Sequence, residues 1–376
     1  MGLFNVYPLY DVTPISAKGI YVYDQNHQEY LDLYGGHAVI SIGHSHPTYV
    51  KAISEQVAKL GFYSNAIQNP LQKQLATKIE LLSDCKDYQL FLCNSGAEAN
   101  ENALKLASFK TGKSRVIAFK NGFHGRTSAA VAATDNATII APINAQQKVT
   151  TLELNDIQGV ERELKKGDVC AVLIEFIQGV GGLDQATAEF FEQVNVLCKA
   201  NNTFFIADEV QSGYGRSGKF FAFQHYNVTP DIISIAKGMG NGFPIGGILI
   251  HPSIEAKFGM LGTTFGGNHL ACVASLSVLN VIEKEALIDN VKEMSEYFIK
   301  IAKTIPQIKN IKGRGLMLGL EFEYEVADLR KKLIYEYQIF TGGAANKKLL
   351  RILPPLTIKK DHINQFFEAL VDALHE

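Results

Sequence analysis

The chain has 376 residues, of which 47% are hydrophobic and 20% are charged, a balance typical of a globular protein. This length exceeds that of one ordinary core and predicts two domains in one structural unit. The net charge is -2, from 36 Lys and Arg against 38 Asp and Glu. No run of like charge is longer than a few residues, so we expect neither a nucleic-acid partner nor binding to an anionic membrane.

The cysteines indicate a reducing compartment. They are odd in number, show no Cys-x-x-Cys spacing and mostly lie inside apolar runs, which favours buried thiols over disulfides or a zinc site. The N-terminus lacks the pattern of a signal peptide, and no stretch approaches the ~18 apolar residues of a membrane span. We therefore expect a cytoplasmic protein. The five cysteines are Cys85, Cys93, Cys170, Cys198 and Cys272.

Helical and strand-like segments alternate along the first two thirds of the chain. Apolar residues at helical spacing predict helices over residues 47–60, 71–82 and 186–200. Short runs that are apolar on both faces predict buried strands between such helices, and this order favours a mostly parallel sheet covered on both sides. The predicted strands are residues 89–93, 115–119, 170–174, 203–207, 231–235 and 247–250.

From about Gly259 the pattern changes to that of a smaller α+β domain. A helix is predicted over residues 270–283, a strand over 316–322, and a final helix from Asp361. The N-terminal residues contain two strand-like segments that we expect beside this domain. The predicted division is an N-terminal segment (1–45) packing with the small domain, a large α/β domain (46–258) and the small domain (259–376).

Polar residues follow most of the predicted strands. In an open parallel sheet, ligands gather beyond the carboxyl ends of the strands, so these residues are the candidates for a site. Together they supply a lysine, carboxylates, an aromatic ring, an arginine and a glycine-rich helix start. They are Asn94-Ser95-Gly96, Gly122-Phe123-His124-Gly125-Arg126, Glu175, Asp208-Glu209-Val210-Gln211 and Lys237.

Lys237 and Asp208 each end an apolar run. A lysine at a strand end beside glycines can be desolvated, which lowers its pKa and makes the amine a nucleophile toward an aldehyde. A surface lysine at a strand exit is the alternative. A lone Asp at a strand end is more often a cap, but a lysine on a nearby strand favours a functional role for Asp208.

The segment Ser95-Gly96-Ala97-Glu98 opens a predicted helix that runs to about Lys110. Ser-x-x-Glu is a capping box, which is a structural interpretation. A phosphate at the helix N-terminus is the functional one, because Gly96 and Ala97 let backbone N–H groups approach an anion closely. The two interpretations are compatible.

Two other motifs could be mistaken for binding sites, one for a dinucleotide and one for a metal ion. Residues 213–218 match Gly-x-Gly-x-x-Gly, but the segment lacks the strand–turn–helix context of a dinucleotide site, so we expect no nicotinamide enzyme. His44 and His46 lack further metal-ligand residues nearby. A structural turn is therefore favoured there, and no metal site is expected.

Five motifs, in their order along the chain, resemble those of the class-III (ω-amino acid) aminotransferases, which have fold type I and bind pyridoxal 5'-phosphate (PLP). The resemblance covers essentially the whole chain and is closest to the acetylornithine aminotransferases of arginine biosynthesis. The motifs are Asn94-Ser95-Gly96-Ala97-Glu98-Ala99-Asn100, Phe123-His124-Gly125-Arg126-Thr127, Asp208-Glu209-Val210-Gln211, Ala236-Lys237-Gly238 and Thr264-Phe265-Gly266-Gly267-Asn268.

The resemblance implies a role for each cofactor residue. Lys237 would hold PLP as a Schiff base and move the substrate proton, while Asp208 would keep the pyridine nitrogen protonated. Gln211 would contact the ring hydroxyl and Phe123 would stack on the ring. The phosphate would lie at Ser95, Gly96 and Ala97, and Thr264 would reach the phosphate of a neighbouring subunit, which implies a homodimer.

The resemblance also implies roles for the residues that would bind the substrates. Arg126 would bind a substrate carboxylate with its guanidinium fork. Arg351 would take the α-carboxylate of glutamate or 2-oxoglutarate, and Thr263 would contact an acylated ornithine. Other ω-amino donors, such as ornithine or 4-aminobutyrate, and a PLP-binding protein without turnover are the alternatives.

Two positions depart from the family pattern. In relatives, a glutamate pairs with the arginine that Arg351 matches and acts as a gate between the two substrates. Val180 stands at the position of this glutamate, so the gate cannot operate in the same form here. His37 stands where relatives show an apolar or aromatic residue. Loss of an acid and gain of a possible cation favour an acyl group that ends in a carboxylate, and N-succinylornithine over N-acetylornithine is our hypothesis.

Overall fold

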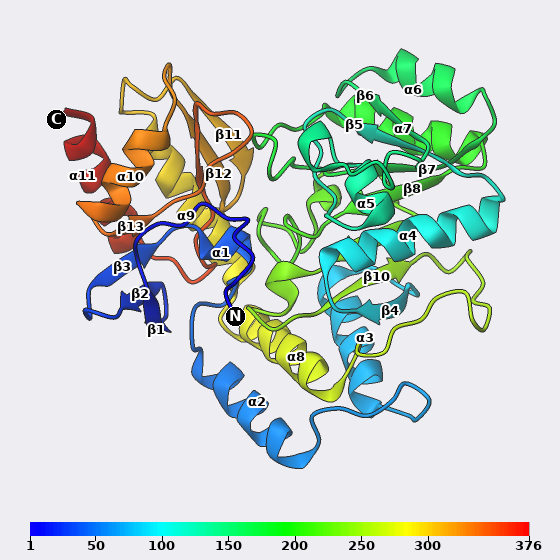
Figure 1. The fold of residues 1–376 in the computed structure, drawn as a ribbon, viewed down its shortest axis with the longest axis horizontal. Coiled ribbons are helices and arrows are strands. Elements are labelled where there is room, and N and C mark those ends of the chain that lie inside the picture. The colour runs from blue at the N-terminus through cyan, green and yellow to red at the C-terminus, as the bar shows by residue number, and fades with distance from the viewer. Residues whose placement is uncertain (376) are drawn as a thin grey trace.

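A computed structural model describes residues 1–375. Its largest sheet has seven strands in the order β4-β10-β9-β8-β7-β5-β6 (Figure 1). The pairs from β6 to β9 are parallel, whereas β10 runs antiparallel to both β9 and β4. The expected mostly parallel sheet is confirmed. The strands are β4 (Gln89–Cys93), β5 (Arg115–Phe119), β6 (Val149–Leu152), β7 (Val169–Ile174), β8 (Phe204–Asp208), β9 (Ile232–Ile235) and β10 (Gly246–Ile250).

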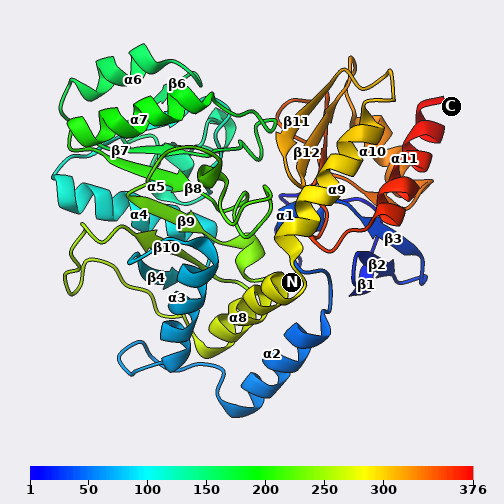
Figure 2. The same cartoon turned by 180° about the vertical axis from the view of Figure 1, so that it is seen from behind.

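Helices cover both faces of this sheet. Because side chains alternate along a strand, Leu173 and Ile206 pack in one core with α4, while Val172 and Phe205 pack in another with α7. Helix α4 lies over the face seen in Figure 1, and α7 over the face seen in Figure 2. The helices of this part are α3 (Pro70–Ser83), α4 (Gly96–Thr111), α5 (Ser128–Ala132), α6 (Ile157–Leu164) and α7 (Ala188–Ala200).

Two smaller sheets form the other half of the molecule. One is antiparallel, with the order β11-β12-β14, and the other has the order β1-β2-β3-β13. In the second, β13 pairs in parallel with β3, so the N-terminal strands lie beside the C-terminal part, as expected. These strands are β1 (Pro14–Lys18), β2 (Tyr21–Asp24), β3 (Glu29–Asp32), β11 (Asn310–Arg314), β12 (Met317–Glu321), β13 (Ile339–Phe340) and β14 (Leu349–Ile352).

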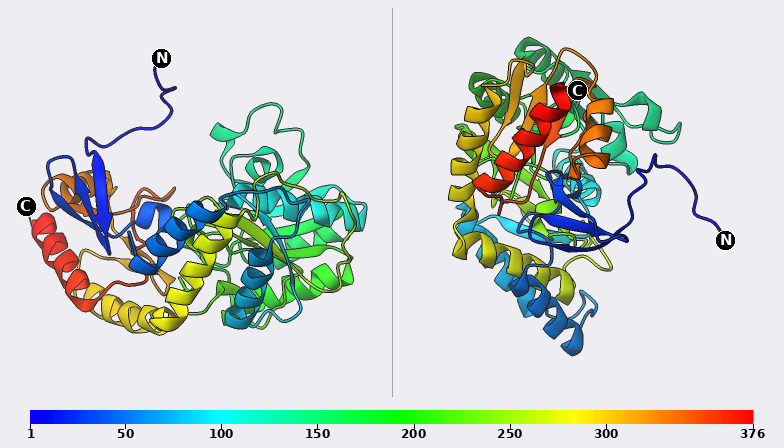
Figure 3. Two further views of the ribbon diagram at one scale, coloured as in Figure 1. Left: turned by 90° about the horizontal axis from the view of Figure 1, so that it is seen from below. Right: turned by 90° about the vertical axis from the view of Figure 1, so that its left-hand side faces the viewer.

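Two successive helices connect the halves. Helix α8 packs against α2 and α3, and α9 continues from it to pack against α11 (Figure 3, left). The apolar content of both helices fits this buried position. The remaining helices are α1 (Gly35–Ala38), α2 (Pro47–Lys59), α8 (His269–Lys284), α9 (Leu287–Ala302), α10 (Ala327–Tyr335) and α11 (Lys360–His375).

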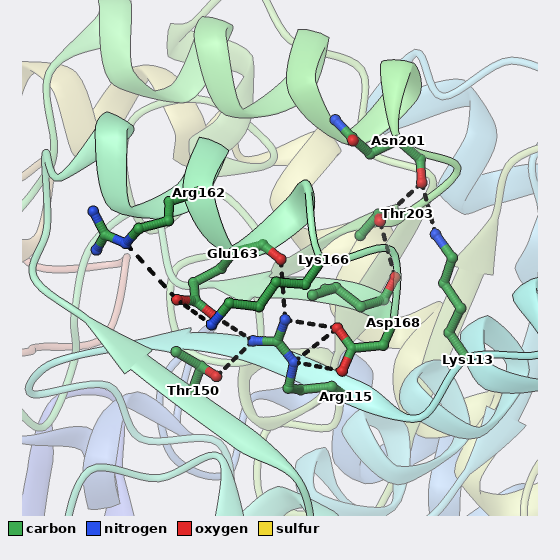
Figure 4. A network of polar contacts seen from close by, with 10 residues as sticks. Lys113, Arg115, Thr150, Arg162, Glu163, Lys166, Asp168, Asn201 and Thr203 are labelled. Carbon is green, nitrogen blue, oxygen red and sulfur yellow. Dashed lines mark hydrogen bonds and ion pairs between the residues drawn. The ribbon is translucent and has the colours of Figure 1, made fainter.

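A polar network fastens the edge of the large sheet (Figure 4). Arg115, at the start of β5, donates from Nη1 to Glu163 Oε2 on α6 (2.6 Å) and to Thr150 Oγ1 on β6 (2.8 Å). Its Nη2 donates to Asp168 Oδ1 (2.6 Å), and Lys166 Nζ donates to Glu163 Oε2 (2.7 Å). Edge strand β6 is therefore held by side chains as well as by its pairing with β5.

Within residues 1–375, no helix has the length and apolar character that a membrane crossing requires.

Candidate active site

A cavity of about 370 Å³ opens at the carboxyl ends of the parallel strands. Its walls come from the segments that follow β4, β5, β7, β8 and β9, together with the turn before β10. Most of the residues singled out from the sequence line it. They are Ser95, Gly96, Ala97, Phe123, Arg126, Asp208, Gln211 and Lys237.

Lys237 lies two residues after the end of β9 and begins a short 3-10 helix. Its backbone has φ 47, a left-handed conformation that is unfavourable for a side chain with a Cβ and is often found at functional sites. Burial lowers the pKa of its ammonium, against the opposing charges of Asp208 and Glu175. The expected desolvation is therefore present, and the side chain reaches the neutral, nucleophilic form more readily than a surface lysine.

Asp208 is held in place by two buried partners. His124 Nδ1 lies 2.7 Å from Asp208 Oδ2, and Asn100 Nδ2 donates to the same oxygen at 2.8 Å. Burial alone would lower the pKa of His124. The hydrogen bond to Asp208 and the negative charge of Asp208 outweigh this effect, and the pKa is raised. Both partners belong to motifs quoted from the sequence, but their roles depend on contacts across the fold that spacing does not show.

Glu175 supports the loop that carries Phe123. Its Oε2 accepts from the Phe123 N–H (2.9 Å), and its Oε1 accepts from the Gly179 N–H (2.9 Å). Burial raises the pKa of this carboxyl. The two backbone bonds therefore fix the loops after β5 and β7 relative to each other.

The N-terminus of α4 is closely packed. Ser95 Oγ accepts from the Glu98 N–H (3.2 Å), while Glu98 Oε2 accepts from the Asn94 N–H (2.7 Å) rather than from that of Ser95. A Cβ on Gly96 would lie 2.5 Å from Val210 Cγ1, so a larger residue could not keep this backbone position. The unpaired N–H groups of the first turn thus face the cavity on a fixed backbone.

The substrate candidates are distributed more widely. Arg126 lines the cavity and is exposed. Arg351, on β14, is 3% exposed and donates to two carbonyl oxygens, from Nε to Gly343 (2.5 Å) and from Nη1 to Gly179 (2.6 Å). The main chain of Val180 accepts from the Ala345 N–H (2.8 Å). Val180 thus connects the same loops as Arg351, but its apolar side chain provides no carboxylate to pair with the Arg351 guanidinium.

His37 lies in an unusual backbone segment. Residues 35–38 all have positive φ, and the carbonyl of His37 accepts from Gln211 Nε2 (3.0 Å). Its ring forms a short hydrogen bond with the Tyr34 hydroxyl. Partial burial and the charges of Arg351, Lys237 and Arg330 lower the pKa of His37 to about 4, so the ring is neutral at pH 7 rather than cationic.

Neither Thr263 nor Thr264 lines this cavity, although Thr263 Oγ1 accepts from Nδ2 of Asn94, a residue that does line it (3.4 Å). Thr263 Oγ1 accepts from the Gly266 N–H (3.1 Å) and borders a separate hollow with Asn65 and Gln72. Thr264 is exposed in the single chain and does not line the cavity.

The two motifs set aside on the sequence have structural contacts. Arg216, in the glycine-rich segment, is 2% exposed and donates to the carbonyls of Leu316 and Pro354. His44 Nε2 lies 2.8 Å from Asp32 Oδ2, and His46 caps α2 by accepting from the Thr48 N–H. The Arg216 contacts join the two halves, whereas the histidine contacts lie within the N-terminal part of the chain.

The family model of the class-III aminotransferases matches residues 6–374. The chain belongs to this family. It is 38% identical to acetylornithine aminotransferase of Bacillus subtilis, over 99% of this chain and 97% of that protein, and 39% identical to acetylornithine aminotransferase of Aquifex aeolicus, over 99% of each. An ornithine aminotransferase of Toxoplasma gondii, solved with partial occupancy of PLP at its active site, matches with a TM-score of 0.90 at 28% identity, over 98% of this chain and 90% of that chain.

Class-III aminotransferases depend on PLP, and the cavity fits this group. It offers a desolvated lysine amine, a fixed carboxylate at Asp208 and the first turn of α4. Gln211 Oε1 is buried without a hydrogen-bond partner in the described chain, which leaves an acceptor free for a ligand hydroxyl. Each polar feature of PLP therefore has a matching group in this chain.

Proposed function

We propose that the protein transfers the terminal amino group of an N-acylated ornithine to 2-oxoglutarate, a step of arginine biosynthesis. The meeting of Lys237, Asp208 and Arg126 in one cavity carries the proposal, because it combines a nucleophilic amine, a fixed carboxylate and a guanidinium for a substrate carboxylate. The names of the curated relatives at 36–39% identity support this substrate class.

PLP, when bound, supplies an electrophilic carbonyl and a protonated ring that withdraws electrons from the carbon bearing the substrate amine. Lys237 would hold the cofactor and then move a proton to and from that carbon. Asp208, oriented by His124 and Asn100, would keep the proton on the ring nitrogen. Gln211 would bind the ring hydroxyl, Phe123 would cover one ring face, and Gly96 and Ala97 would bind the phosphate.

Substrate orientation would depend on the arginines and on a second subunit. Arg126 would hold the donor carboxylate, and Arg351 the α-carboxylate of 2-oxoglutarate or glutamate. In a cytoplasmic homodimer, Thr264 of one chain would reach the phosphate bound by its partner, with Thr263 near the donor. The exposed position of Thr264 outside its own cavity supports this arrangement.

The visible absorption spectrum of purified protein with PLP tests the proposal. We expect a yellow band that N-acetylornithine or N-succinylornithine removes and 2-oxoglutarate restores. A band that responds to ornithine or 4-aminobutyrate instead would transfer the assignment to another donor of the same family. No band after addition of PLP would contradict the role of Lys237.

A further inference from the structure

The turn that follows Lys237 is fastened to a distant part of the chain by one amide side chain. Asn241 is 5% exposed, and its Oδ1 accepts hydrogen bonds from the N–H groups of Ser41 (2.8 Å) and Ile42 (3.0 Å). Its Nδ2 donates to the carbonyl of Gly43 (3.0 Å). A single buried side chain therefore holds three consecutive residues from the N-terminal part of the chain, and both lone pairs of its oxygen have donors.

Two hydroxyl groups strengthen the same joint. Ser41 Oγ donates to the carbonyl of Gly238, the residue after Lys237 (2.7 Å), and the Tyr49 hydroxyl donates to the carbonyl of Gly240 (2.8 Å). Within the turn, the Gly240 N–H donates to the Lys237 carbonyl (2.9 Å). The carbonyl groups of Lys237, Gly238 and Gly240 thus all have donors, and two of these donors are side chains of the N-terminal part.

The joint supports two unusual backbone conformations. Lys237 and Asn241 both have φ 47. This left-handed region is unfavourable for lysine, whereas asparagine adopts it more readily than most residues with a Cβ. Such a conformation persists only where the surrounding contacts determine it, and the hydrogen bonds across the joint provide these contacts at Lys237. Glycine at position 241 would keep the backbone conformation and lose only the amide.

The loop formed by residues 39–43 also borders the cavity. Val39 lines the cavity, as Lys237 does. Just before this loop, the carbonyl of His37 accepts from Gln211 Nε2 (3.0 Å). PLP carries its ring hydroxyl and its aldehyde on neighbouring ring carbons, and the proposed partners of these two groups are Gln211 and Lys237. One stretch of backbone therefore contacts the supports of both.

The C-terminal half holds the other side of this loop. The Leu356 N–H, a few residues beyond β14, donates to the carbonyl of Ser41 (2.7 Å). Through its N–H, hydroxyl and carbonyl groups, Ser41 therefore contacts both the turn of Lys237 and the C-terminal half. The loop is fixed on two sides, so the joint ties the Lys237 turn to a supported part of the fold.

We propose that Asn241 and Ser41 are positioning residues, which hold loop 39–43 against the turn of Lys237 and so fix the direction in which the Lys237 amine enters the cavity. Neither of the two lines the cavity, so both act through Lys237. The inference deepens the proposed function and rests on it for the role of Lys237. Loss of the joint should slow proton movement by this lysine and leave substrate binding, which depends on other residues, nearly unchanged.

Steady-state kinetics of the PLP-loaded variants test the proposal. In Asn241→Gly the left-handed backbone is kept, while three backbone groups lose their partner. We expect kcat to fall about tenfold or more, because small displacements of a catalytic group are costly, with KM for the amino donor changed less than about twofold. Ser41→Ala should also lower kcat, to a smaller extent, and it replaces Asn241→Gly in the test if that variant does not fold.

Hydrogen exchange of the same PLP-loaded variants gives a readout that is independent of turnover. The amides of Ser41 and Ile42 should exchange about tenfold or more faster in Asn241→Gly, because their acceptor is lost. Asn155→Gly is the matched control. Asn155 is also left-handed (φ 70), its Oδ1 accepts from the Thr187 N–H (2.9 Å), and it does not line the cavity. This control should keep wild-type kcat and wild-type exchange at both amides.

Wild-type kcat in folded Asn241→Gly would overturn the proposal, since the amide would then serve only the conformation of residue 241; wild-type kcat in Ser41→Ala decides in the same way where Asn241→Gly does not fold. An equal fall of kcat in Asn155→Gly would also overturn it, because the effect would then be one of general stability. Failure of the proposed function is seen separately. A wild type without a visible band after addition of PLP rejects the role of Lys237, whatever the variants do.

Discussion

At the scale of single residues, the properties of Lys237 arise from its surroundings. The lysine follows a buried strand in a left-handed conformation and has a pKa lowered by burial. A strand exit is usually solvated, but here the loops after β5, β7 and β8 converge on it. The same amino acid on the surface would stay protonated at pH 7.

We predict that Lys237→Ala lowers the transamination rate by about 10²- to 10⁴-fold, the usual contribution of a positioned acid–base group. The unfolding temperature of the PLP-free proteins serves only to show that the variant is folded, because loss of the amine also removes the charge that opposes the buried carboxyls of Asp208 and Glu175. Rate assays and thermal melts of the variant beside Lys331→Ala, at a surface lysine paired with Asp328, provide the measurement. Wild-type turnover by Lys237→Ala would refute this role.

Gly96 provides a second prediction at this scale. Gly96→Ala would place a Cβ 2.5 Å from Val210 Cγ1 and displace the first turn of α4. We expect the dissociation constant of PLP to rise by about tenfold, because phosphate contacts depend on the position of that turn.

Fluorescence titration with PLP measures the effect of Gly96→Ala. Gly262→Ala is the control, because a Cβ there meets no atom within 4 Å. The double variant Gly96→Ala with Val210→Ala should recover most of the affinity. If the single and double variants bind PLP equally, the steric explanation fails.

At the scale of elements, the Arg115 network determines how firmly the edge of the sheet is held. Strand β6 has a neighbour on one side only, so its stability depends on the side chains that connect it to β5 and α6. The hydrogen bonds from Arg115 lower the pKa of Asp168, and those from Lys166 and Arg115 lower the pKa of Glu163.

We predict that Arg115→Met destabilises the protein by about 2 kcal/mol at pH 7, as expected for loss of one partner in a partly buried network. Because the carboxyl pKa values are lower in the folded state, this contribution is complete above their ordinary values near 4 and is lost as the pH falls through the folded values. The difference between wild type and variant should therefore close below about pH 4.

Urea unfolding of the wild type and Arg115→Met at pH 7, 5 and 3.5 checks this dependence. Lys165→Met is the control, because Lys165 pairs with Glu161 and makes no contact with the network. A difference that persists unchanged at pH 3.5 would mean that Arg115 acts through packing alone.

At the scale of the whole molecule, apolar side chains are exposed on helix α2 and on the segments that follow α2 and precede α8. Helix α2 has no buried residue in the single chain, and its Val57 is 59% exposed. The rings of Phe62 and Phe265 contact each other at an interplanar angle of 52°, with their centroids 5.4 Å apart, while remaining 43% and 58% exposed. Apolar side chains gathered in this way usually mark an interface.

We predict a dimer of about 83 kDa, twice the 41.4 kDa of one chain, in light scattering after gel filtration. Phe62→Asp with Phe265→Asp should shift the mass toward one chain, because each places an unpaired charge in the contact. Tyr324→Asp, at an exposed residue in the other half, should leave the dimer intact. A monomeric wild type would contradict the proposed contribution of Thr264.

The three-part division into residues 1–45, 46–258 and 259–376 remains a proposal at this scale. The pairing of β3 with β13 places the first segment beside the last one. Helix α8 begins within the third segment but packs against α2 and α3 of the second, so the two are joined by a substantial contact.

Local patterns in the sequence determined much of the fold and the centre of the site. Runs that are apolar on both faces predicted strands at residues 89–93 and 115–119, and these are the observed bounds of β4 and β5. The polar residues that follow such runs include Asp208 and Lys237, which line the cavity. Burial on both faces leaves a clear apolar run, and parallel strands bring their ends together, so spacing along the chain was sufficient there.

Only the tertiary structure decided the rest. Edge strand β6 is partly exposed and has no apolar run, and the antiparallel direction of β10 depends on its pairing with β4 and β9. The contacts of Asn100 with Asp208 and of Asn241 with Ser41 join segments from different elements. Such contacts follow from how elements pack in three dimensions, which periodicity along the chain does not encode.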